Sequence, residues 1–206
     1  SADLAAVATF GFPQILQLPQ ALSVNLPART VLIAAMNVAP NYNISLRAYT
    51  TEENLLTSTA VGFPMVISSP GILKPFSMLH SGGKVFFLYV NFSDSRIHMK
   101  TYDGSVLDEQ IFSNTDLDAA FGVAGCTFKH NSEEYIALTY ARSTSEISIV
   151  TFKSDEFPNT ATFTLNIGTF DSFSVPITHN PRTGIFALTW TDLAGNAYHK
   201  SGTMTS

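Results

Sequence analysis

Residues 30–37 read TVLIAAMN, an apolar run rich in β-branched residues whose length and composition indicate a buried β-strand. Runs of the same kind return three times, as KVFFLYVN over residues 84–91, EYIALTYA over 134–141 and GIFALTWT over 184–191. Their second residues are spaced by 54, 50 and 50 positions. A nearly constant period of this length is typical of one structural unit copied along a chain. The sequence therefore predicts four equivalent units.

Three further segments accompany each run, and all of them are short, rich in strand-forming residues and bounded by turn residues. One precedes the run, as LSVNL (22–26), FSMLH (76–80), CTFKH (126–130) and VPITH (175–179). An alternating segment follows it, as NISLRAY (43–49), RIHMKTY (96–102), EISIVTF (146–152) and NAYHKSG (196–202). A last segment closes the unit, as LLTSTAVGF (55–63), VLDEQIFS (106–113) and TATFTLNIG (160–168). Each unit is thus predicted to be a four-stranded antiparallel sheet.

The closing segment of the fourth unit has its counterpart at the front of the chain, where residues 3–12 read DLAAVATFGF. Gly11, Gly62 and Gly168 then occupy the same position of the repeat. We expect residues 4–9 to pair with residues 197–203, so that the two ends of the chain share one sheet.

This layout resembles the β-propeller superfamily, and in size it is similar to four-bladed, hemopexin-like rings. The resemblance implies a single all-β domain, a four-bladed β-propeller with four antiparallel strands per blade and an N-terminal strand closing the last one. Its repeats are approximately residues 12–62, 63–113, 114–168, and 169–206 with 1–11. No motif of a specific propeller family is present, and the lone Cys126 precludes the disulfide of hemopexin-type domains. The alternatives are a β-sandwich and half of an eight-bladed ring completed by a second copy.

Composition narrows the possible partners. Apolar residues make up 45% of the chain and charged residues 13%, which excludes a disordered chain. The net charge is -5 and the basic residues are scattered, so we expect no nucleic-acid partner. No apolar run is long enough to span a membrane. The sequons at Asn43 and Asn91 permit N-glycosylation of a secreted protein, and a secreted or cell-surface location is favoured. We expect a monomer or a homodimer.

Three histidines occupy one repeat position, just before the turn into the second strand: His80, His130 and His179. Equivalent positions of a closed ring converge near its axis, and imidazoles bind metals well, so a metal site is one interpretation. The other is that these histidines are hairpin-turn residues, which their Gly, Asn, Ser and Pro neighbours favour. Since metal-binding spacings such as HExxH are missing, we predict no metal and no other cofactor.

Three further residues are expected to be buried. His98 and His199 lie on third strands, and His199 aligns with Leu46, Met99 and Ile149, so a hydrogen-bonded core histidine is the favoured interpretation. Trp190 aligns with apolar residues near the end of its strand and is also interpreted as core.

Candidate ligand-binding residues lie in the loops at one end of the predicted blades. The loops between second and third strands supply Asn41, Tyr42, Asp94, Arg142 and Asp192. The loops that lead to the next blade supply Phe12, Phe63, Phe170 and Asp116. One aromatic and one polar side chain per blade suits a sugar or a peptide. The alternative is that each phenylalanine packs a blade edge and each Asp or Asn builds a turn.

The leading functional hypothesis is a non-catalytic, lectin-like recognition module that binds a glycan or a protein partner through one face of the ring. A first alternative is a propeller-based glycoside hydrolase or lyase using loop carboxylates, with Asp116 and Asp118, or Asp155 and Glu156, as candidate pairs. A second is a structural subunit or excised domain of a larger assembly. Because no catalytic motif such as GxSxG is present, we predict no catalytic residue.

Overall fold

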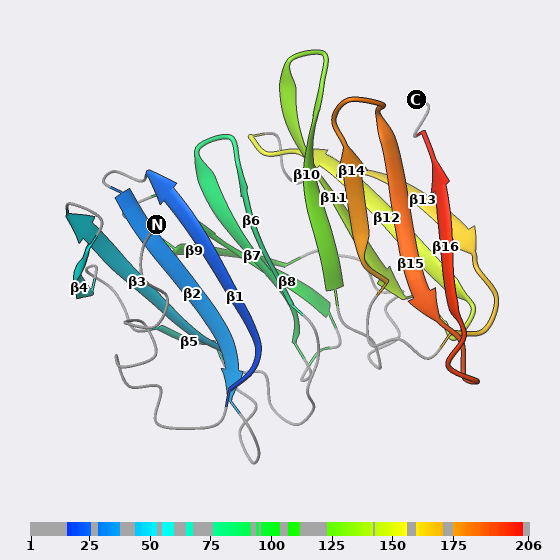
Figure 1. The fold of residues 1–206 in the computed structure, drawn as a ribbon, viewed down its shortest axis with the longest axis horizontal. Coiled ribbons are helices and arrows are strands. Elements are labelled where there is room, and N and C mark those ends of the chain that lie inside the picture. Colours follow the sequence, from blue (N-terminus) through cyan, green and yellow to red (C-terminus); the bar gives the residue numbers. More distant parts are fainter. Residues whose placement is uncertain are drawn as a thin grey trace.

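The computed structural model is all-β in the part of the chain that it describes, and its strands form four antiparallel sheets (Figure 1). That part comprises residues 16–25, 29–37, 44–52, 55–59, 65–67, 76–91, 94, 96–103, 107–111, 123–141, 143–155, 160–170 and 175–203. Within it there is no helix, and so none that is long and apolar enough to cross a membrane.

Each sheet is formed by strands that follow one another in the chain. The first sheet contains β1 (Leu16–Asn25), β2 (Arg29–Asn37), β3 (Ile44–Glu52), β4 (Leu55–Thr59) and β5 (Met65–Ile67). The second contains β6 (Ser77–Ser81), β7 (Lys84–Asn91), β8 (Arg96–Tyr102) and β9 (Leu107–Ile111). The third contains β10 (Val123–His130), β11 (Glu133–Ala141), β12 (Glu146–Lys153) and β13 (Thr160–Asn166). The last contains β14 (Ile177–Asn180), β15 (Ile185–Thr191) and β16 (Ala197–Gly202).

Local sequence explains the tight turns between the first two strands of the middle sheets. Ser81 pairs with Lys84 across Gly82 and Gly83, which have φ values of 56° and 71°. The equivalent turn of the third sheet contains Asn131 and Ser132, with φ values of 50° and 69°. Two-residue hairpin loops need positive φ because only this backbone twist matches that of the flanking strands. The predicted all-β class and these hairpins are confirmed.

The prediction of a closed four-bladed β-propeller is wrong, and with it the resemblance to that superfamily. The four sheets form an open row in which β1 contacts β6, β6 contacts β10 and β10 contacts β14. The first and last sheets lie at opposite ends of that row (Figure 1). The segment expected to close the ring, residues 4–9, lies outside the described residues.

The outward face of the last sheet explains why the row can stay open. Strand alternation and cross-strand pairing place Thr189 and His199 on that face in one row, and Thr191 and Ala197 in the next. All four residues are exposed. These four small or polar side chains gain little from burial against a further sheet, because the hydrophobic driving force scales with apolar area.

The register of the third sheet also differs from the repeat alignment. The alignment makes Tyr135 equivalent to Val85 and Phe152 equivalent to Tyr102. Val85 does pair with Tyr102, but Phe152 pairs with Ile136. The run at β11 is therefore displaced by one residue, and a shift of one residue in a strand exchanges its two faces.

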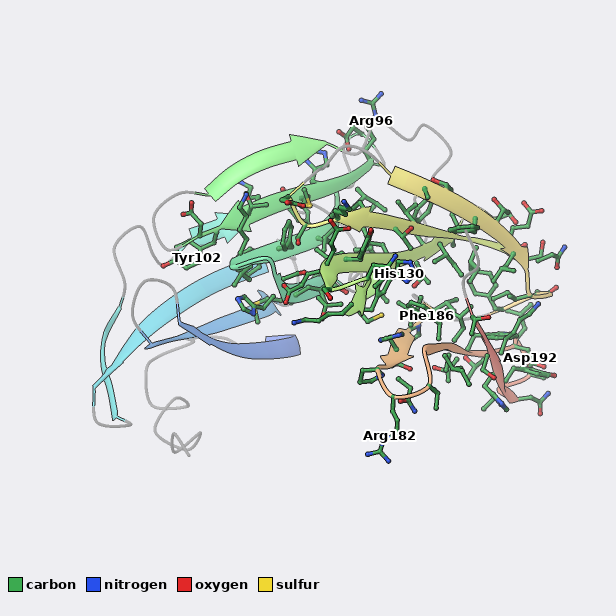
Figure 2. The ribbon with its side chains drawn as sticks, turned by 90° about the horizontal axis from the view of Figure 1, so that it is seen from above. Arg96, Tyr102, His130, Arg182, Phe186 and Asp192 are labelled. Carbon is green, nitrogen blue, oxygen red and sulfur yellow. The ribbon has the colours of Figure 1, made fainter. Side chains whose placement is uncertain are left out.

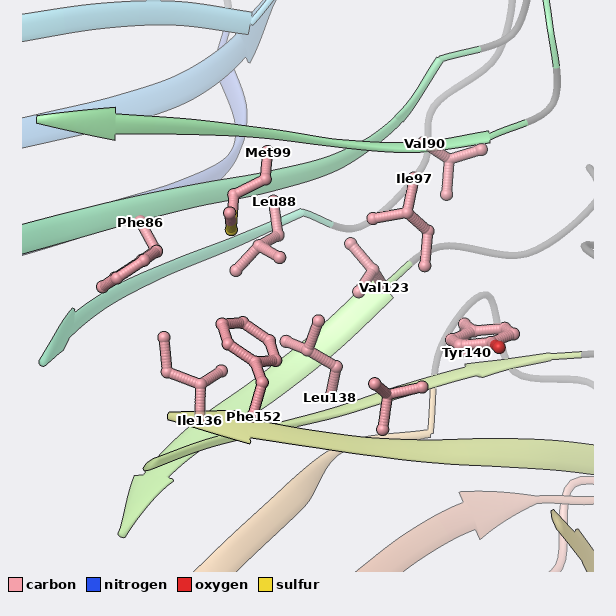
Figure 3. Packing of buried hydrophobic residues seen from close by; sticks show 11 residues of the cluster. Phe86, Leu88, Val90, Ile97, Met99, Val123, Ile136, Leu138, Tyr140 and Phe152 are labelled. Carbon is pink, nitrogen blue, oxygen red and sulfur yellow. The ribbon is translucent and has the colours of Figure 1, made fainter. Parts of the chain in front are cut away.

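Two apolar clusters of described residues hold the second, third and last sheets together. The larger lies between the second and third sheets (Figure 3) and includes Phe86, Leu88, Leu138 and Phe152. The rings of Phe86 and Phe152 meet edge to face with centroids 6.4 Å apart, a favoured aromatic geometry. The second cluster lies between the third and last sheets and includes Phe186, which Figure 2 places at that interface. Within the described part of the chain, the last sheet is therefore attached to the row by one face only.

Candidate functional site

Of the nine predicted ligand-binding residues, three lie in the described part of the chain: Asp94, Asp192 and Phe170. The other six lie outside it: Asn41, Tyr42, Arg142, Phe12, Phe63 and Asp116. A ligand-binding role for any of the nine stays a prediction.

Asp94 is engaged with its own hairpin. One carboxylate oxygen accepts a hydrogen bond from the backbone N–H of Arg96 at 3.1 Å, and the other lies 2.9 Å from Nε2 of His98. Burial by itself would raise the pKa of Asp94, but the hydrogen bonds from His98 and Arg96 outweigh it and lower that pKa. His98 is buried and its ring lies 5.6 Å from that of Tyr89. The interpretation of His98 as a hydrogen-bonded core histidine is confirmed.

Asp192 organises the turn between β15 and β16, at the end of the last sheet opposite Arg182 (Figure 2). One oxygen accepts hydrogen bonds from the backbone N–H groups of Ala194 and Asn196, at 2.9 and 2.8 Å. The other accepts from the Asn196 amide and the Tyr198 hydroxyl, both at 2.9 Å. The hydrogen bonds from Asn196 contribute most to lowering the pKa of Asp192. Both oxygens are thus used within the turn.

Phe170 is only 2% exposed and packs in the cluster between the third and last sheets, together with Val175 and Ile177. Its backbone N–H donates a hydrogen bond to the carbonyl of Thr144 at 3.1 Å. The side chain that was predicted to contact a ligand therefore contributes to the core, as large aromatic residues usually do.

The three repeat-position histidines lie near the tips of separate hairpins. His80 and His130 are exposed, and the ring of His179 packs on Phe128 and Phe186 with centroids 5.5 and 4.6 Å away. Burial lowers the pKa of His179. Among the described residues, no three His, Cys, Asp or Glu side chains are close enough together to hold a metal ion.

The cysteine thiol and the predicted carboxylate pairs provide no catalytic group among the described residues. Burial raises the pKa of the Cys126 thiol to about 12, so this thiol stays protonated and is a poor nucleophile at neutral pH. Of the predicted carboxylate pairs, Asp155 is described and exposed, whereas Glu156, Asp116 and Asp118 lie outside the described residues.

His199 corrects one sequence prediction. It was expected in the core because its repeat equivalents are apolar, but it is exposed on β16, as are all residues of that strand. Trp190 is half-buried, and its ring stacks on that of Tyr198 with centroids 5.9 Å apart and an interplanar angle of 17°. Tyr198 itself is 45% exposed. The last strand is therefore more accessible than its repeat equivalents suggest.

The free edge of β16 is the clearest binding feature of the described structure. In the other three sheets the third strand is covered by β4, β9 or β13, but no described strand pairs with the outer edge of β16. The backbone N–H of Thr189 donates to the carbonyl of Pro176 at 3.2 Å, so Thr189 directs its backbone groups toward β14. By strand alternation His199, which is opposite Thr189, directs its N–H and C=O to the free edge.

An apolar cavity of about 270 Å³ lies beside this edge, between the third and last sheets. Phe163 of β13 forms part of its wall and is 37% exposed. The other lining residues are Ile149, Leu165, Ile177, Phe186, Leu188, Lys200, Ser201, Gly202 and Thr203. Sequence reasoning missed this site because it assigned a strand of the chain itself to the same edge.

A shallower depression of about 480 Å³ lies at the Asp192 end of the same sheet. It is lined by Pro176, Thr189, Trp190, Thr191, Ala197, Tyr198 and His199. Unlike the cavity beside Phe163, it is open and has more polar side chains in its wall.

Away from the free edge, Glu134 joins the second and third sheets. Its carboxylate accepts hydrogen bonds from the Gly82 backbone N–H and, at 3.4 Å, from the Ser81 hydroxyl, and it lies 3.3 Å from the Lys129 amine. The hydrogen bond from Gly82 is the main cause that lowers the pKa of Glu134, against the opposing effect of burial. This contact links the β6–β7 hairpin to the start of β11.

Glu134→Gln is expected to make the free energy of unfolding less dependent on pH between pH 7 and pH 3. Because folding lowers the pKa of Glu134, its ionised form stabilises the fold above the ordinary pKa of 4.5, and this contribution is lost as the pH falls through the lowered value. The stability difference between wild type and variant should therefore be largest near pH 7 and shrink toward pH 3. Urea unfolding at both pH values measures it. A difference that stays constant with pH would contradict this role of the charge.

Comparison with known proteins identifies no relative that would indicate a function for the site. No protein-family model matches the sequence, and no curated protein is significantly similar to it. The free edge of β16 and the cavity beside it are accordingly the features on which a function can be argued.

Proposed function

We propose that this chain is a non-catalytic recognition module that binds an extended segment of a protein along the free edge of β16. An unpaired strand edge offers a row of backbone donors and acceptors, and an added strand satisfies them through main-chain hydrogen bonds. The open edge of β16 carries this proposal.

The cavity beside the edge supports the same proposal, because strand addition gains its specificity from pockets that take alternate side chains. The inward face of β16 presents Tyr198, Lys200 and Gly202, which are opposite Trp190, Leu188 and Phe186. Lys200 and Gly202 line the cavity together with Phe163. An apolar side chain of an added strand would cover the exposed part of the Phe163 ring, and Lys200 would favour an acidic residue nearby.

His199→Pro is the variant that tests strand addition. Proline removes the N–H that His199 directs to the free edge, whereas the hydrogen bonds to β15 are made by the neighbouring residues, so the sheet should stay intact. His199→Ala is the matched control, because it removes the same side chain and keeps the N–H.

The measurement is a selection from a displayed library of random peptides, followed by titration of the enriched peptides. We expect peptides with alternating apolar residues that bind wild type and His199→Ala equally and bind His199→Pro at least tenfold more weakly. Enriched peptides that bind all three proteins equally, or a selection that enriches none from protein that is monomeric by light scattering, would contradict the proposal.

A glycan is the second candidate ligand, and the depression near Asp192 favours it. Tyr198 is exposed and stacks on Trp190, and sugar rings stack on aromatic faces of this kind. A glycan array probed with wild type and Tyr198→Ala tests it, with loss of signal in the variant as the expected result. An array without any signal would remove this candidate.

A further inference from the structure

We infer that the strand added to β16 is residues 3–10 from a second copy of this chain, so that two copies exchange their N-terminal segments. This inference rests on the proposed strand-binding edge and names its occupant.

The sequence of the segment corresponds to the strand that would pair with β16 and that is missing among the described residues. In the third sheet β13 fills the position next to β12, with Ile147 opposite Leu165 and Ile149 opposite Phe163. Residues 3–11 read DLAAVATFG, and β13 with its flanking residues, 160–168, reads TATFTLNIG. Both segments place a glycine directly after an apolar residue at the same position of the repeat. The N-terminal segment thus corresponds to this element by its glycine and the apolar residue before it.

This match also sets the register of the added strand. With Gly11 equivalent to Gly168, Ala8 corresponds to Leu165 and Ala6 to Phe163. Since β16 corresponds to β12 at a spacing of 50 residues, Ala6 would lie opposite His199. The pair next to it would then be Val7 and Tyr198.

The chemistry of this register suits the site. Residues that are directly opposite share one face of a sheet, so Val7 would lie on the inward face with Tyr198, and Ala5 would lie on the same face opposite Lys200, which lines the cavity. Asp3 would lie diagonally across from Lys200, where the two charges are complementary. The segment therefore supplies a small apolar side chain, Ala5, beside the cavity and an acidic residue for Lys200.

The open row of sheets favours a second copy as the donor. Residues 1–15 lead into β1, which belongs to the first sheet, and that sheet lies at the opposite end of the row from β16 (Figure 1). Two copies related by a twofold axis can place the first sheet of each next to the last sheet of the other. Such an exchange is reciprocal and closed, because both free edges are then covered.

Cysteine trapping tests the donor and the register together. His199 directs its backbone groups to the added strand, so Val7 and Tyr198 would form a non-hydrogen-bonded pair, in which side chains are closest. The test variant carries Val7→Cys and Tyr198→Cys, with Cys126→Ala to remove the natural thiol. Val7→Cys with Thr178→Cys is the matched control, because Thr178 is on β14, away from the free edge.

We expect the first pair to give a disulfide-linked dimer on a non-reducing gel and the control pair to give none. A disulfide within one chain would overturn the second copy as donor, and two free thiols would overturn the occupant altogether. Unmodified wild type provides an independent measurement by light scattering. It should have twice the mass of the 22.3 kDa chain, and Val7→Asp should return it to one chain. A wild type that stays at one chain mass at high concentration would also overturn the inference.

The two proposals fail separately. If peptides bind wild type and not His199→Pro while wild type remains a monomer, the edge binds strands but its partner is another protein. If neither peptides nor a second copy bind in a manner sensitive to His199→Pro, the proposed function fails as well.

Discussion

Phe152→Ala is expected to lower the free energy of unfolding by about 3–5 kcal/mol, the usual cost of removing a buried phenylalanine ring. Phe152 is 2% exposed and joins β12 to the cluster between the second and third sheets. Its ring contacts that of Phe86 edge to face, so alanine would remove this contact and leave a cavity in the larger of the two clusters. Urea denaturation followed by tryptophan fluorescence and circular dichroism measures the change.

The matched control is Phe163→Ala, on the neighbouring strand β13. Phe163 is 37% exposed and lies in the wall of an open cavity, so truncating it removes less buried area and should cost about 1 kcal/mol or less. Equal losses for the two variants would contradict the assignment of Phe152 to the core. At low protein concentration the comparison is independent of any association between copies.

Because the sheets form an open row, Phe152→Ala also tests whether all four sheets unfold in one cooperative transition. In a row of sheets each sheet contacts only its neighbours, so stability is divided among the interfaces between them. Phe152 belongs to one interface, and its loss should separate the unfolding of the first two sheets from that of the last two. A second transition in the circular dichroism curve of the variant, absent from wild type, is the expected sign.

Much of the local structure could be predicted from the sequence. The four apolar runs mark strands β2, β7, β11 and β15, because length, β-branching and flanking turn residues act over a few positions. The hairpin turns at Gly82 and Asn131 follow from the positive φ that such turns require. The burial of His98 does not follow from alternation, since Ile97, His98 and Met99 are all buried along β8.

Features that depend on which face of a sheet is covered were predicted less well. Tyr135 and Ile136 are both good strand residues, so composition does not distinguish the register in which Ile136 is opposite Phe152 from the one shifted by a residue. Closure of a ring depends on the apolar area of the last sheet, and there the exposed Thr189 and His199 are paired where the second sheet pairs the buried Leu88 and Met99.

In the candidate site too, local features could be predicted from the sequence and features that depend on the arrangement of the sheets could not. The sequence located Asp94 and Asp192 correctly in turns, but their hydrogen bonds depend on backbone N–H groups whose directions are set by the folded turn. The free edge of β16 followed from neither composition nor motif, since it is defined by the absence of a neighbouring strand among the described residues. Only the arrangement of the sheets shows that edge.

Gly125→Val is expected to be the second most destabilising change, with a loss of about 2–3 kcal/mol, as for overpacking in a filled core. Gly125 lies in β10 opposite Leu138. A Cβ atom at this position would come within 2.7 Å of Cδ2 of Leu138, 2.9 Å of Cδ1 of Leu79 and 3.1 Å of the backbone oxygen of Ala137. Leu138 is fully buried, so its end can rotate only into occupied space, and the backbone oxygen is held in the ladder between β10 and β11.

The control for this variant is Gly202→Val in β16, where nothing lies within 4 Å of the added Cβ atom. Because Gly202 is exposed and replacing glycine restricts the unfolded chain, its stability should change by about 0.5 kcal/mol or less, or rise slightly. The smaller change Gly125→Ala should fall between the two, at about 1–2 kcal/mol. Thermal unfolding of the three variants beside wild type gives the order. If Gly125→Val proved as stable as Gly202→Val, β10 would not lie against Leu79 as described, and the close approach of the second and third sheets on which the core depends would be wrong.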